Sequence, residues 1–521
     1  MKTVVVFVAL YSYQNFPVRI LHPLLEREKP DVKTYSVFLK NCEVNTFDHP
    51  TTIEEKIFLE KIRELNPTIV SFTVLSPYFS VAKKLSSLIK QQQPDIIIIW
   101  GGIHPTIYPE SCVNEADIVC VGEGEGAIVD LVTKIQQNES YCDINNLWVK
   151  TDDKIVKNPL RPLIQNLDSL PTPLYGSDAF FFIENNSTSK KDPILSNSVY
   201  LIQSSRGCPW RCSFCVNSLM KPLYKDLGMF VRRKSVGNVI SEIKEFLEKT
   251  NGITKYILFV DEVFSIDKTW LDEFIKQYPT QIGLPFYVEY HPKLLNVELL
   301  DTLVAAGLDT IDLGIQSGSD NVRNVIYNRP GTNKEIIPLA KEIVKRNITL
   351  KFDLILDGPY DTEADLEETI KLLYELPKPL HINFFSMQFF PNYPLTNRAI
   401  QDNIIKPDES HMENLIEKTM KNWRYRSKLF PVSRLNALKN IIWLIGTNNE
   451  NDKTVKTAVF SKGIFPVLIL GYLHVKSVII NSIFGVGRPV IISHSISAFD
   501  YIKKGNFSLI VKKFKEHYLG R

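Results

Sequence analysis

The sequence has 521 residues, of which 44% are hydrophobic, 11% aromatic and 23% charged. This composition is typical of a globular protein and leaves room for about two to four domains. Lys and Arg number 61 and Asp and Glu number 58, so the formal net charge is +3. Such a near balance argues against nucleic acid as a main partner.

The chain starts with the apolar run "MKTVVVFVALYSYQ", which lacks an A-x-A-like cleavage site and is rich in valine. These features favour a buried first strand over a signal peptide. The closest approach to a membrane span, residues 464–473, is shorter than the roughly 20 apolar residues that a spanning helix needs and contains Pro466. Seven cysteines in so long a chain do not form a disulfide framework. We therefore predict a soluble, cytoplasmic protein.

Five short apolar runs alternate with amphipathic segments between residue 3 and about residue 136, and they predict five strands. The runs are "TVVVFVALY", "KTYSVFLK", "TIVSFTVL", "DIIIIWGG" and "DIVCVGEG". Between them, "TTIEEKIFLEKIREL" and "YFSVAKKLSSLIKQQ" carry apolar residues at i, i+3 and i+4, which predicts helices. Apolar strands that alternate with helices are typical of a doubly wound parallel α/β sheet. We assign this first domain to residues 1–140.

Small and polar residues follow several of these strands, where doubly wound sheets bind their ligands. The strand ends carry "LSP" at residues 75–77, "GGIHP" at residues 101–105 and "GEGEG" at residues 122–126. The glycines of "GEGEG" are a weak signal, because tight turns explain them as well as phosphate contacts do. The G-x-G-x-x-G pattern is absent after the first strand, which argues against a nicotinamide cofactor.

The βα alternation is interrupted at residues 141–197 and resumes in residues 198–398. "LWVKTDDKIVKN" predicts a hairpin and "SLPTPLYG" a Pro-stiffened connector, so we interpret residues 141–197 as a linker. Six further strands are predicted, in "SVYLIQ", "KYILFVDE", "PFYVEYHP", "TIDLGIQSG", "TLKFDLILDGP" and "HINFFSMQFFP". Helical patterns separate nearly all of them. Six βα units are fewer than the eight of a closed barrel, so we predict a partial (β/α)6 barrel with its site at the carboxyl ends of the strands.

Residues 399–521 mix basic and aromatic residues, and we predict a mainly helical C-terminal domain that closes the barrel. Its segment "GIFPVLILGYLHVKSVIINSIFGVG", residues 463–487, has lysines nearby. Two interpretations are open for this segment. A buried helical core is favoured, and peripheral contact with a membrane surface, with a lipid-like substrate, is the alternative.

Cys208, Cys212 and Cys215 form a C-x3-C-x2-C pattern directly after the first barrel strand. A structural zinc site needs four ligands, but no cysteine follows Cys215 and no histidine lies between Tyr200 and His291. A catalytic disulfide is not favoured, because the loop is not a simple C-x-x-C at the start of a helix. Three thiolates can instead hold a 4Fe-4S cluster, which normally takes four, and one iron then stays open.

The cysteine loop resembles that of the radical S-adenosylmethionine (SAM) superfamily, C-x3-C-x-φ-C, with Phe214 as the aromatic φ. The resemblance implies a 4Fe-4S cluster whose open iron binds the amino and carboxylate groups of SAM. Reductive cleavage of SAM then releases a 5′-deoxyadenosyl radical, which takes a hydrogen atom from an unactivated carbon. A closed apolar barrel protects such a radical from water.

Three further segments resemble the family at the ends of barrel strands. "FVDEVF" ends the second strand, near the SAM amino group or the substrate, and "GIQSGSD" ends the fourth, near the ribose or carboxylate. "DLILDGPYDTEADLEET" resembles the fifth-strand segment near the adenine, although Asp361 stands where Glu is usual. The SAM-binding residues implied by the resemblance are Phe214, Asp261, Glu262, Gln316, Ser317, Gly318, Leu356 and Gly358.

The first domain resembles cobalamin-binding domains, in which S-x-L ends one strand and G-G ends the next. Here "TVL" and Gly101-Gly102 take those places, and the resemblance to cobalamin-binding radical SAM proteins covers about residues 3–398. The D-x-H-x-x-G motif that supplies a cobalt-ligating histidine is missing, since the loop after the first strand reads "YSYQNFPVRI". The cobalamin-binding residues implied by the resemblance are Thr73, Leu75, Ser76, Gly101, Gly102, His104, Gly122, Glu123 and Gly124. For His104, a satisfied loop side chain is favoured over a cobalt ligand.

The combined resemblance implies methylation of an unactivated carbon or phosphorus centre of a small-molecule or lipid-like substrate. One SAM would remethylate cobalamin and a second would give the radical, with a reductant such as flavodoxin or ferredoxin. Two alternatives are open. The first is a radical rearrangement or oxidative cyclisation without methyl transfer, and the second is a sensor that binds an iron–sulfur cluster and cobalamin. The polar ends of the barrel strands argue against the sensor, and no DNA-reading motif is present.

Overall fold

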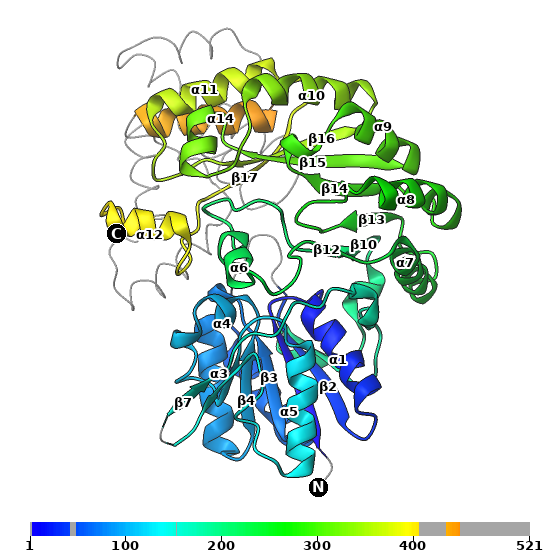
Figure 1. The fold of residues 1–521 in the computed structure, drawn as a ribbon, viewed down its shortest axis with the longest axis vertical. Helices are drawn as coiled ribbons and strands as arrows, with labels where there is room; N and C mark the ends of the chain where they lie inside the picture. Colours follow the sequence, from blue (N-terminus) through cyan, green and yellow to red (C-terminus); the bar gives the residue numbers. More distant parts are fainter. Residues whose placement is uncertain (1–2, 42–47, 153, 406–433, 449–521) are drawn as a thin grey trace, which may run out of the picture. The chain divides into compact units, whose positions relative to one another are not determined.

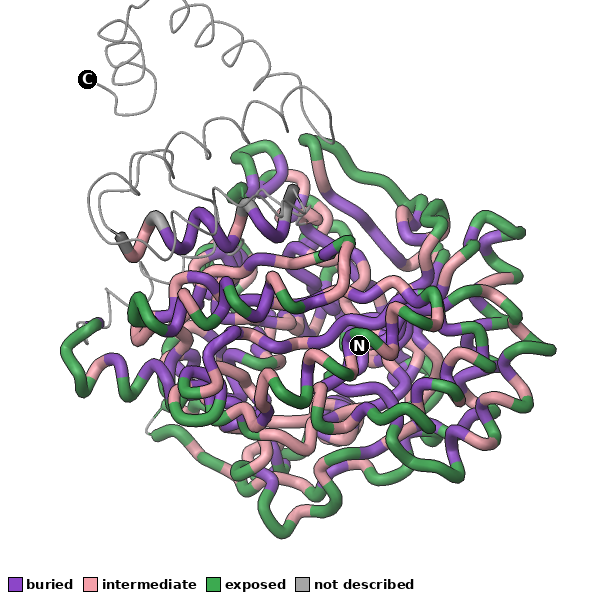
Figure 2. Tube along the Cα trace, turned by 90° about the horizontal axis from the view of Figure 1, so that it is seen from above, coloured by how far each residue is buried: buried purple, intermediate pink, exposed green. Residues whose placement is uncertain are grey.

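The computed structural model describes residues 3–41, 48–152, 154–405 and 434–448. The chain forms two compact units, the first of residues 1–360 and 383–425 and the second of residues 361–382 and 426–521. The first unit holds two mainly parallel sheets with helices around them (Figure 1). The central strands of the first sheet are buried along most of their length, whereas the helices around it have both buried and exposed residues. Figure 2 shows the buried and exposed residues along the chain.

The N-terminal sheet contains the five predicted strands, and they pair in parallel in the order β5-β4-β3-β1-β2. The doubly wound α/β class predicted for this domain is confirmed. The strand bounds are β1 (Val4–Leu10), β2 (Lys33–Leu39), β3 (Ile69–Thr73), β4 (Ile97–Gly101) and β5 (Ile118–Cys120).

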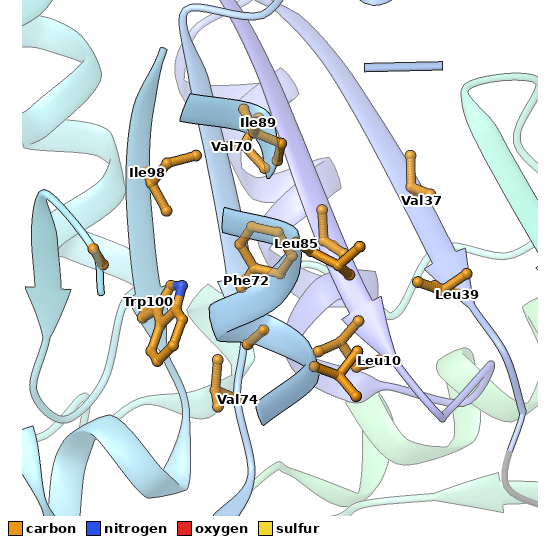
Figure 3. Packing of buried hydrophobic residues seen from close by; sticks show 14 of the residues in the cluster. Leu10, Val37, Leu39, Val70, Phe72, Val74, Leu85, Ile89, Ile98 and Trp100 are labelled. Carbon is orange, nitrogen blue, oxygen red and sulfur yellow. The ribbon is translucent and has the colours of Figure 1, made fainter. Parts of the chain in front are cut away.

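Helices cover both faces of this sheet. On one face, Leu85 and Ile89 of α3 lie over Val70 and Phe72 of β3 (Figure 3). On the other face, α1 and α5 pack against each other. Helix α1 was not predicted from the sequence, and it contains Pro17 at its start and Pro23 in its interior. The helix bounds are α1 (Phe16–Glu28), α2 (Thr52–Leu65), α3 (Phe79–Gln92), α4 (Ile103–Ile107) and α5 (Glu125–Gln137).

Residues 141–197, interpreted as a linker with a hairpin, contain the predicted hairpin and also extend the first sheet. Strands β6 (Leu147–Lys150) and β7 (Ile155–Lys157) form a hairpin that pairs with β5, and β8 (Phe180–Glu184) and β9 (Ser187–Ser189) form another next to β2. Both hairpins extend the first sheet to nine strands. Each covers backbone groups that the outer strands β5 and β2 would otherwise leave unpaired.

The second sheet contains the six predicted barrel strands, in their order along the chain. A βα repeat that adds each new strand beside the last one curves into an open barrel, and the prediction of a partial barrel is confirmed. The strands are β10 (Val199–Ile202), β13 (Tyr256–Phe259), β14 (Phe286–Tyr290), β15 (Leu308–Gln316), β16 (Thr349–Ile355) and β17 (His381–Phe385). The helices between β10 and β16 are α6 (Asn217–Leu223), α7 (Val236–Thr250), α8 (Lys268–Gln281), α9 (Val297–Ala306) and α10 (Asn333–Lys345).

The predicted helical C-terminal domain is described only in part. Helix α12 (Pro394–Gln401) belongs to the first unit, and in the second unit α11 (Glu363–Glu375) packs against α14 (Arg434–Asn448). The apolar segment of residues 463–487 lies outside the described residues. Among the helices that the structure describes, none is long and apolar enough to cross a membrane.

Candidate functional site

The three cysteines of the motif lie in a loop that begins directly after β10. A short antiparallel pair, β11 (Ser205–Arg206) with β12 (Arg232–Arg233), leads into it. Gly207 has a φ of 93°, and a Cβ at this position would overlap the carbonyl oxygen of Phe230. Only glycine fits such a close approach of two backbone segments with positive φ. The local sequence "SSRGC" therefore fixes the turn that presents Cys208.

The rest of the loop is anchored to two other parts of the barrel. The amide of Ser213 donates to the carbonyl of Tyr327 (2.9 Å), and the carbonyl of Ser213 accepts from the amide of Leu395 (3.0 Å). The ring of Phe214 packs edge-on against Tyr327, with ring centroids 5.1 Å apart. The aromatic residue before the last cysteine thus fixes the loop by packing.

Cys208, Cys212 and Cys215 line a single cavity of about 230 Å³ at the carboxyl ends of the barrel strands. Burial raises the pKa of Cys208 to about 11 and also raises that of Cys215. The guanidinium of Arg329 lies beside Cys212, with Nη1 3.4 Å from Sγ. A cation near a buried sulfur compensates the charge that metal binding would place there.

The arrangement of thiols fits a cluster better than a single ion. Among the residues that the structure describes, no group of three or more His, Cys, Asp or Glu side chains has the geometry to hold one metal ion. The ligands of a 4Fe-4S cluster bind separate iron corners and therefore stand further apart. Three thiols around one cavity, with no cysteine after Cys215, suit a cluster with one open iron.

Three of the predicted SAM-binding residues, Phe214, Glu262 and Gln316, line the cavity of the cysteines. The register of β15 against β16 shifts between Gly314 and Gln316, and Gln316 has a φ of 64°. This irregularity places Gln316 at the cavity, and a non-glycine residue at positive φ is typical of functional sites.

Asp261 does not line the cavity, although the prediction paired it with Glu262. Its buried carboxylate accepts hydrogen bonds from the hydroxyls of Ser204 and Ser205 and from the amide of Ser205. Asp261 thereby holds the segment that leads into the cysteine loop. The other predicted SAM residues that do not line the cavity are Ser317, Gly318, Leu356 and Gly358, and their roles stay predictions.

Several residues that line this cavity were not predicted from the sequence. Glu289 lies near the end of β14, and Asp312 and Asp353 lie within β15 and β16. Their signal in the sequence is a single acidic residue inside an otherwise apolar run, as in "YVEY", "TIDLG" and "KFDLI". The remaining missed lining residues are Trp210, Asn217, Val263, Tyr290, His291, Gly314 and Arg329.

A second cavity, of about 200 Å³, lies at the carboxyl edge of the first sheet. Its walls are largely apolar and include Ile20 of α1 and Leu131 of α5. A Cβ at Gly122, where φ is 91°, would overlap the hydroxyl of Tyr224, so the chain needs glycine here. The predicted cobalamin-binding residues that line this sheet-edge cavity are Thr73, Gly101, Gly102, Gly122, Glu123 and Gly124.

Leu75, Ser76 and His104 do not line the sheet-edge cavity. His104 is 3% exposed, and its ring nitrogens Nδ1 and Nε2 lie 2.8 and 3.0 Å from the hydroxyls of Ser76 and Ser111. Burial lowers the pKa of His104 to about 4. Both ring nitrogens are therefore engaged within the protein, as the favoured interpretation of His104 expects.

From the lowered pKa of His104 we predict that the folded protein loses stability at acidic pH. In the unfolded chain the imidazole takes up a proton near its ordinary pKa of 6.5, whereas the folded protein resists it until about 4. The stability is complete above pH 6.5 and falls as the pH drops toward 4, because the unfolded state then binds more protons. At about 1.4 kcal/mol per pKa unit, the loss is on the order of 3 kcal/mol. Urea unfolding of wild type and His104→Gln across this range measures it, and equal pH slopes would contradict it.

Three ion pairs connect the sheet-edge cavity to the segments next to the cysteine loop. Glu123 Oε1 accepts from Nη1 of Arg206 (3.0 Å) and from Nη1 of Arg232 (2.7 Å). Glu125 pairs with Nη2 of the same Arg206 at 2.8 Å. Burial alone would raise the pKa of Glu123, but the charges of Arg206 and Arg232 lower it by a larger amount, so the net shift of the pKa is downward. Arg206 lines the sheet-edge cavity and lies two residues before Cys208.

Comparisons with known proteins match both halves of the site. The model of the Radical SAM superfamily matches residues 202–373, and that of the B12 binding domain matches residues 2–132. An uncharacterised methyltransferase of Pyrococcus horikoshii is 27% identical over 72% of this chain and 75% of its own length. An anaerobic magnesium-protoporphyrin IX monomethyl ester cyclase of Rubrivivax gelatinosus is 26% identical over 70% of this chain and 66% of its own length.

The fold also matches a solved structure. The radical SAM methyltransferase TsrM of Kitasatospora setae, with cobalamin and a 4Fe-4S cluster bound, superposes with a TM-score of 0.64. The match covers 92% of this chain and all of TsrM, at 15% sequence identity. At this identity the likeness concerns the fold alone.

Proposed function

Because this chain belongs to the cobalamin-binding radical SAM proteins, we propose that it is an enzyme that methylates an unactivated carbon or phosphorus centre of a small molecule. When bound, the cluster and SAM supply a 5′-deoxyadenosyl radical, and cobalamin supplies the methyl group. Three thiols around one cavity support the cluster, and Glu262 and Gln316 beside them offer polar groups to SAM.

The observation that carries the proposal is the connection between the two cavities. Both lie in the first unit, and Arg206 and Glu123 join the loop of the thiols to the edge of the first sheet. Methyl transfer to a carbon radical requires both cofactors to reach the same substrate atom. Ion pairs that fix one site against the other support such a shared reaction space.

The sheet-edge cavity fits the apolar part of a large cofactor. Its apolar walls and the glycines at its rim leave room beside the strand ends, and no described histidine lines it. Cobalamin would then be held by packing and hydrogen bonds without a histidine from this cavity.

The test is anaerobic reconstitution of the full chain with iron, sulfide and hydroxocobalamin, followed by desalting and incubation with SAM and a strong reductant. We expect retained corrin absorbance, cluster absorbance and formation of 5′-deoxyadenosine. Flavodoxin or ferredoxin should replace the chemical reductant. Cluster absorbance without corrin would refute methylation, and failure to cleave SAM would favour a binding protein or sensor.

The cyclase among the relatives favours a second candidate, a radical rearrangement or oxidative cyclisation without methyl transfer. The two reactions differ in their products. Methylation forms S-adenosylhomocysteine together with 5′-deoxyadenosine, whereas cyclisation forms no S-adenosylhomocysteine. Counting both products by mass spectrometry separates them once a substrate is found.

A further inference from the structure

Three carboxylates project from neighbouring strands into the cavity of the cysteines. Glu289 of β14 is in register with Asp312 of β15, and Asp353 follows on β16. The amide of Asn383 bridges the last two, with Nδ2 3.1 Å from Asp312 Oδ2 and 3.0 Å from Asp353 Oδ1. We call Glu289, Asp312 and Asp353 the lumen carboxylates.

Two buried polar atoms at this cavity lack a partner. Asp312 is 3% exposed, and within the described part of the chain its Oδ1 has no hydrogen-bond partner. His291 is 1% exposed, and its Nε2 likewise has none, while the imidazole stacks on Trp210. Unpaired buried polar atoms cost stability and are rare in native proteins, so Oδ1 of Asp312 indicates a ligand. Nδ1 of His291 accepts from the amide of Lys293, so Nε2 carries the ring proton and would donate to an acceptor, not bind a cation.

No ion pair joins a described Lys or Arg side chain to Asp312 or Glu289. The guanidinium of Arg329 donates to the carbonyl of Gly314 and to Cys212 Sγ. Lys351 is in register with Asp312, but it does not line the cavity, and no ion pair joins the two in the described chain. Burial and then Asp353 raise the pKa of Asp312 to about 7, and burial and then Asp312 raise that of Glu289 to about 8.

We propose that the lumen carboxylates bind an organic cation, the ammonium or guanidinium group of the substrate. An organic cation donates several hydrogen bonds and supplies the missing positive charge. A bare metal ion fits less well, since no described group has the geometry of a metal site. This inference rests on the proposed function, because it assigns the substrate class of the same cavity.

SAM is itself an organic cation, so the experiment must distinguish the two sources. The probes are benzylamine and phenylguanidine, with benzyl alcohol as the neutral isostere. Their binding to the reconstituted full chain is measured by titration calorimetry with and without saturating SAM, and SAM binding is measured separately. The variants are Asp312→Asn and Glu289→Gln. The control is Asp309→Asn, an exposed carboxylate on the same strand that does not line the cavity.

We expect both cations to bind with SAM present, about 10-fold or more tightly than benzyl alcohol, as hydrogen bonds to charged groups allow. Asp312→Asn and Glu289→Gln should each lower the affinity for the cations by a similar factor and leave the affinity for SAM within about 2-fold of wild type. Asp309→Asn should change neither affinity. Equal binding of cation and alcohol would overturn the proposal. The proposal would also be overturned if the cations bound only in the absence of SAM and Asp312→Asn bound SAM more weakly. The carboxylates would then bind SAM and not the substrate. These binding measurements test the proposal even if the protein transfers no methyl group.

Discussion

A Cys212→Ala variant is expected to lose cluster absorbance and formation of 5′-deoxyadenosine completely. Cys212 is 5% exposed, and at the cysteine cavity its sulfur lies 3.4 Å from Nη1 of Arg329. Removal of one of three thiols leaves too few ligands for a 4Fe-4S cluster. The loss should exceed the roughly 10–100-fold that removal of an outer-shell partner of a metal ligand costs. Visible spectra and product analysis after anaerobic reconstitution measure it.

Two further variants are measured in the same experiment, one with an expected intermediate effect and one as a control. Arg329→Gln removes the cation beside Cys212 but leaves all three thiols, so we expect the cluster to form with activity reduced within that 10–100-fold range. Cys142→Ala removes a half-buried cysteine that lies outside the cavity, and it should behave as wild type. Full SAM cleavage by Cys212→Ala would show that the loop does not hold the catalytic cluster.

The sequence predicted the two sheets well because buried parallel strands carry a strong local signal. Runs such as "VVVFVAL" are apolar throughout, and they are separated by helices with clear periodicity. The helix α1 was missed because Pro17 and Pro23 interrupt its pattern, although proline at the first turn is well tolerated. The hairpin of β6 and β7 was predicted from its sequence, but the pairing of residues 141–197 with β5 and β2 is a long-range property that no local pattern indicates.

The candidate site also has a part that the local sequence predicts and a part that depends on long-range structure. The three cysteines follow from their local spacing, and Gly207 fixes their turn within the same segment. The lumen carboxylates depend on which face of each strand points inward, and this is set by the strand register and the closure of the barrel. Arg206 and Arg232 contact Glu123 across more than eighty residues of sequence, so no local pattern could indicate these ion pairs.

A Glu123→Ala variant should weaken both the fold of the first unit and its hold on cobalamin. The side chain of Arg232 is 4% exposed and would lose its carboxylate partner, and the amide of Ile164 would lose its acceptor at 2.9 Å. Removal of one member of a buried ion pair costs about 3–5 kcal/mol, because the other charge stays buried. Arg206 keeps Glu125, which limits the loss on that side. Urea unfolding and corrin retention after desalting measure the two effects.

The control is Glu110→Gln, which removes an exposed ion pair with Lys157 in the same sheet region, at 3.8 Å. Exposed pairs contribute about 0–1 kcal/mol, so this variant should unfold as wild type and retain corrin. If Glu123→Ala matched that control in both measurements, the ion pairs would be incidental to the positioning of the two cavities. If it lost corrin but kept its cluster, the loop of the thiols would form independently of the first sheet. A loss of both would mean that Glu123 and the two arginines hold the cofactor sites together as one structure.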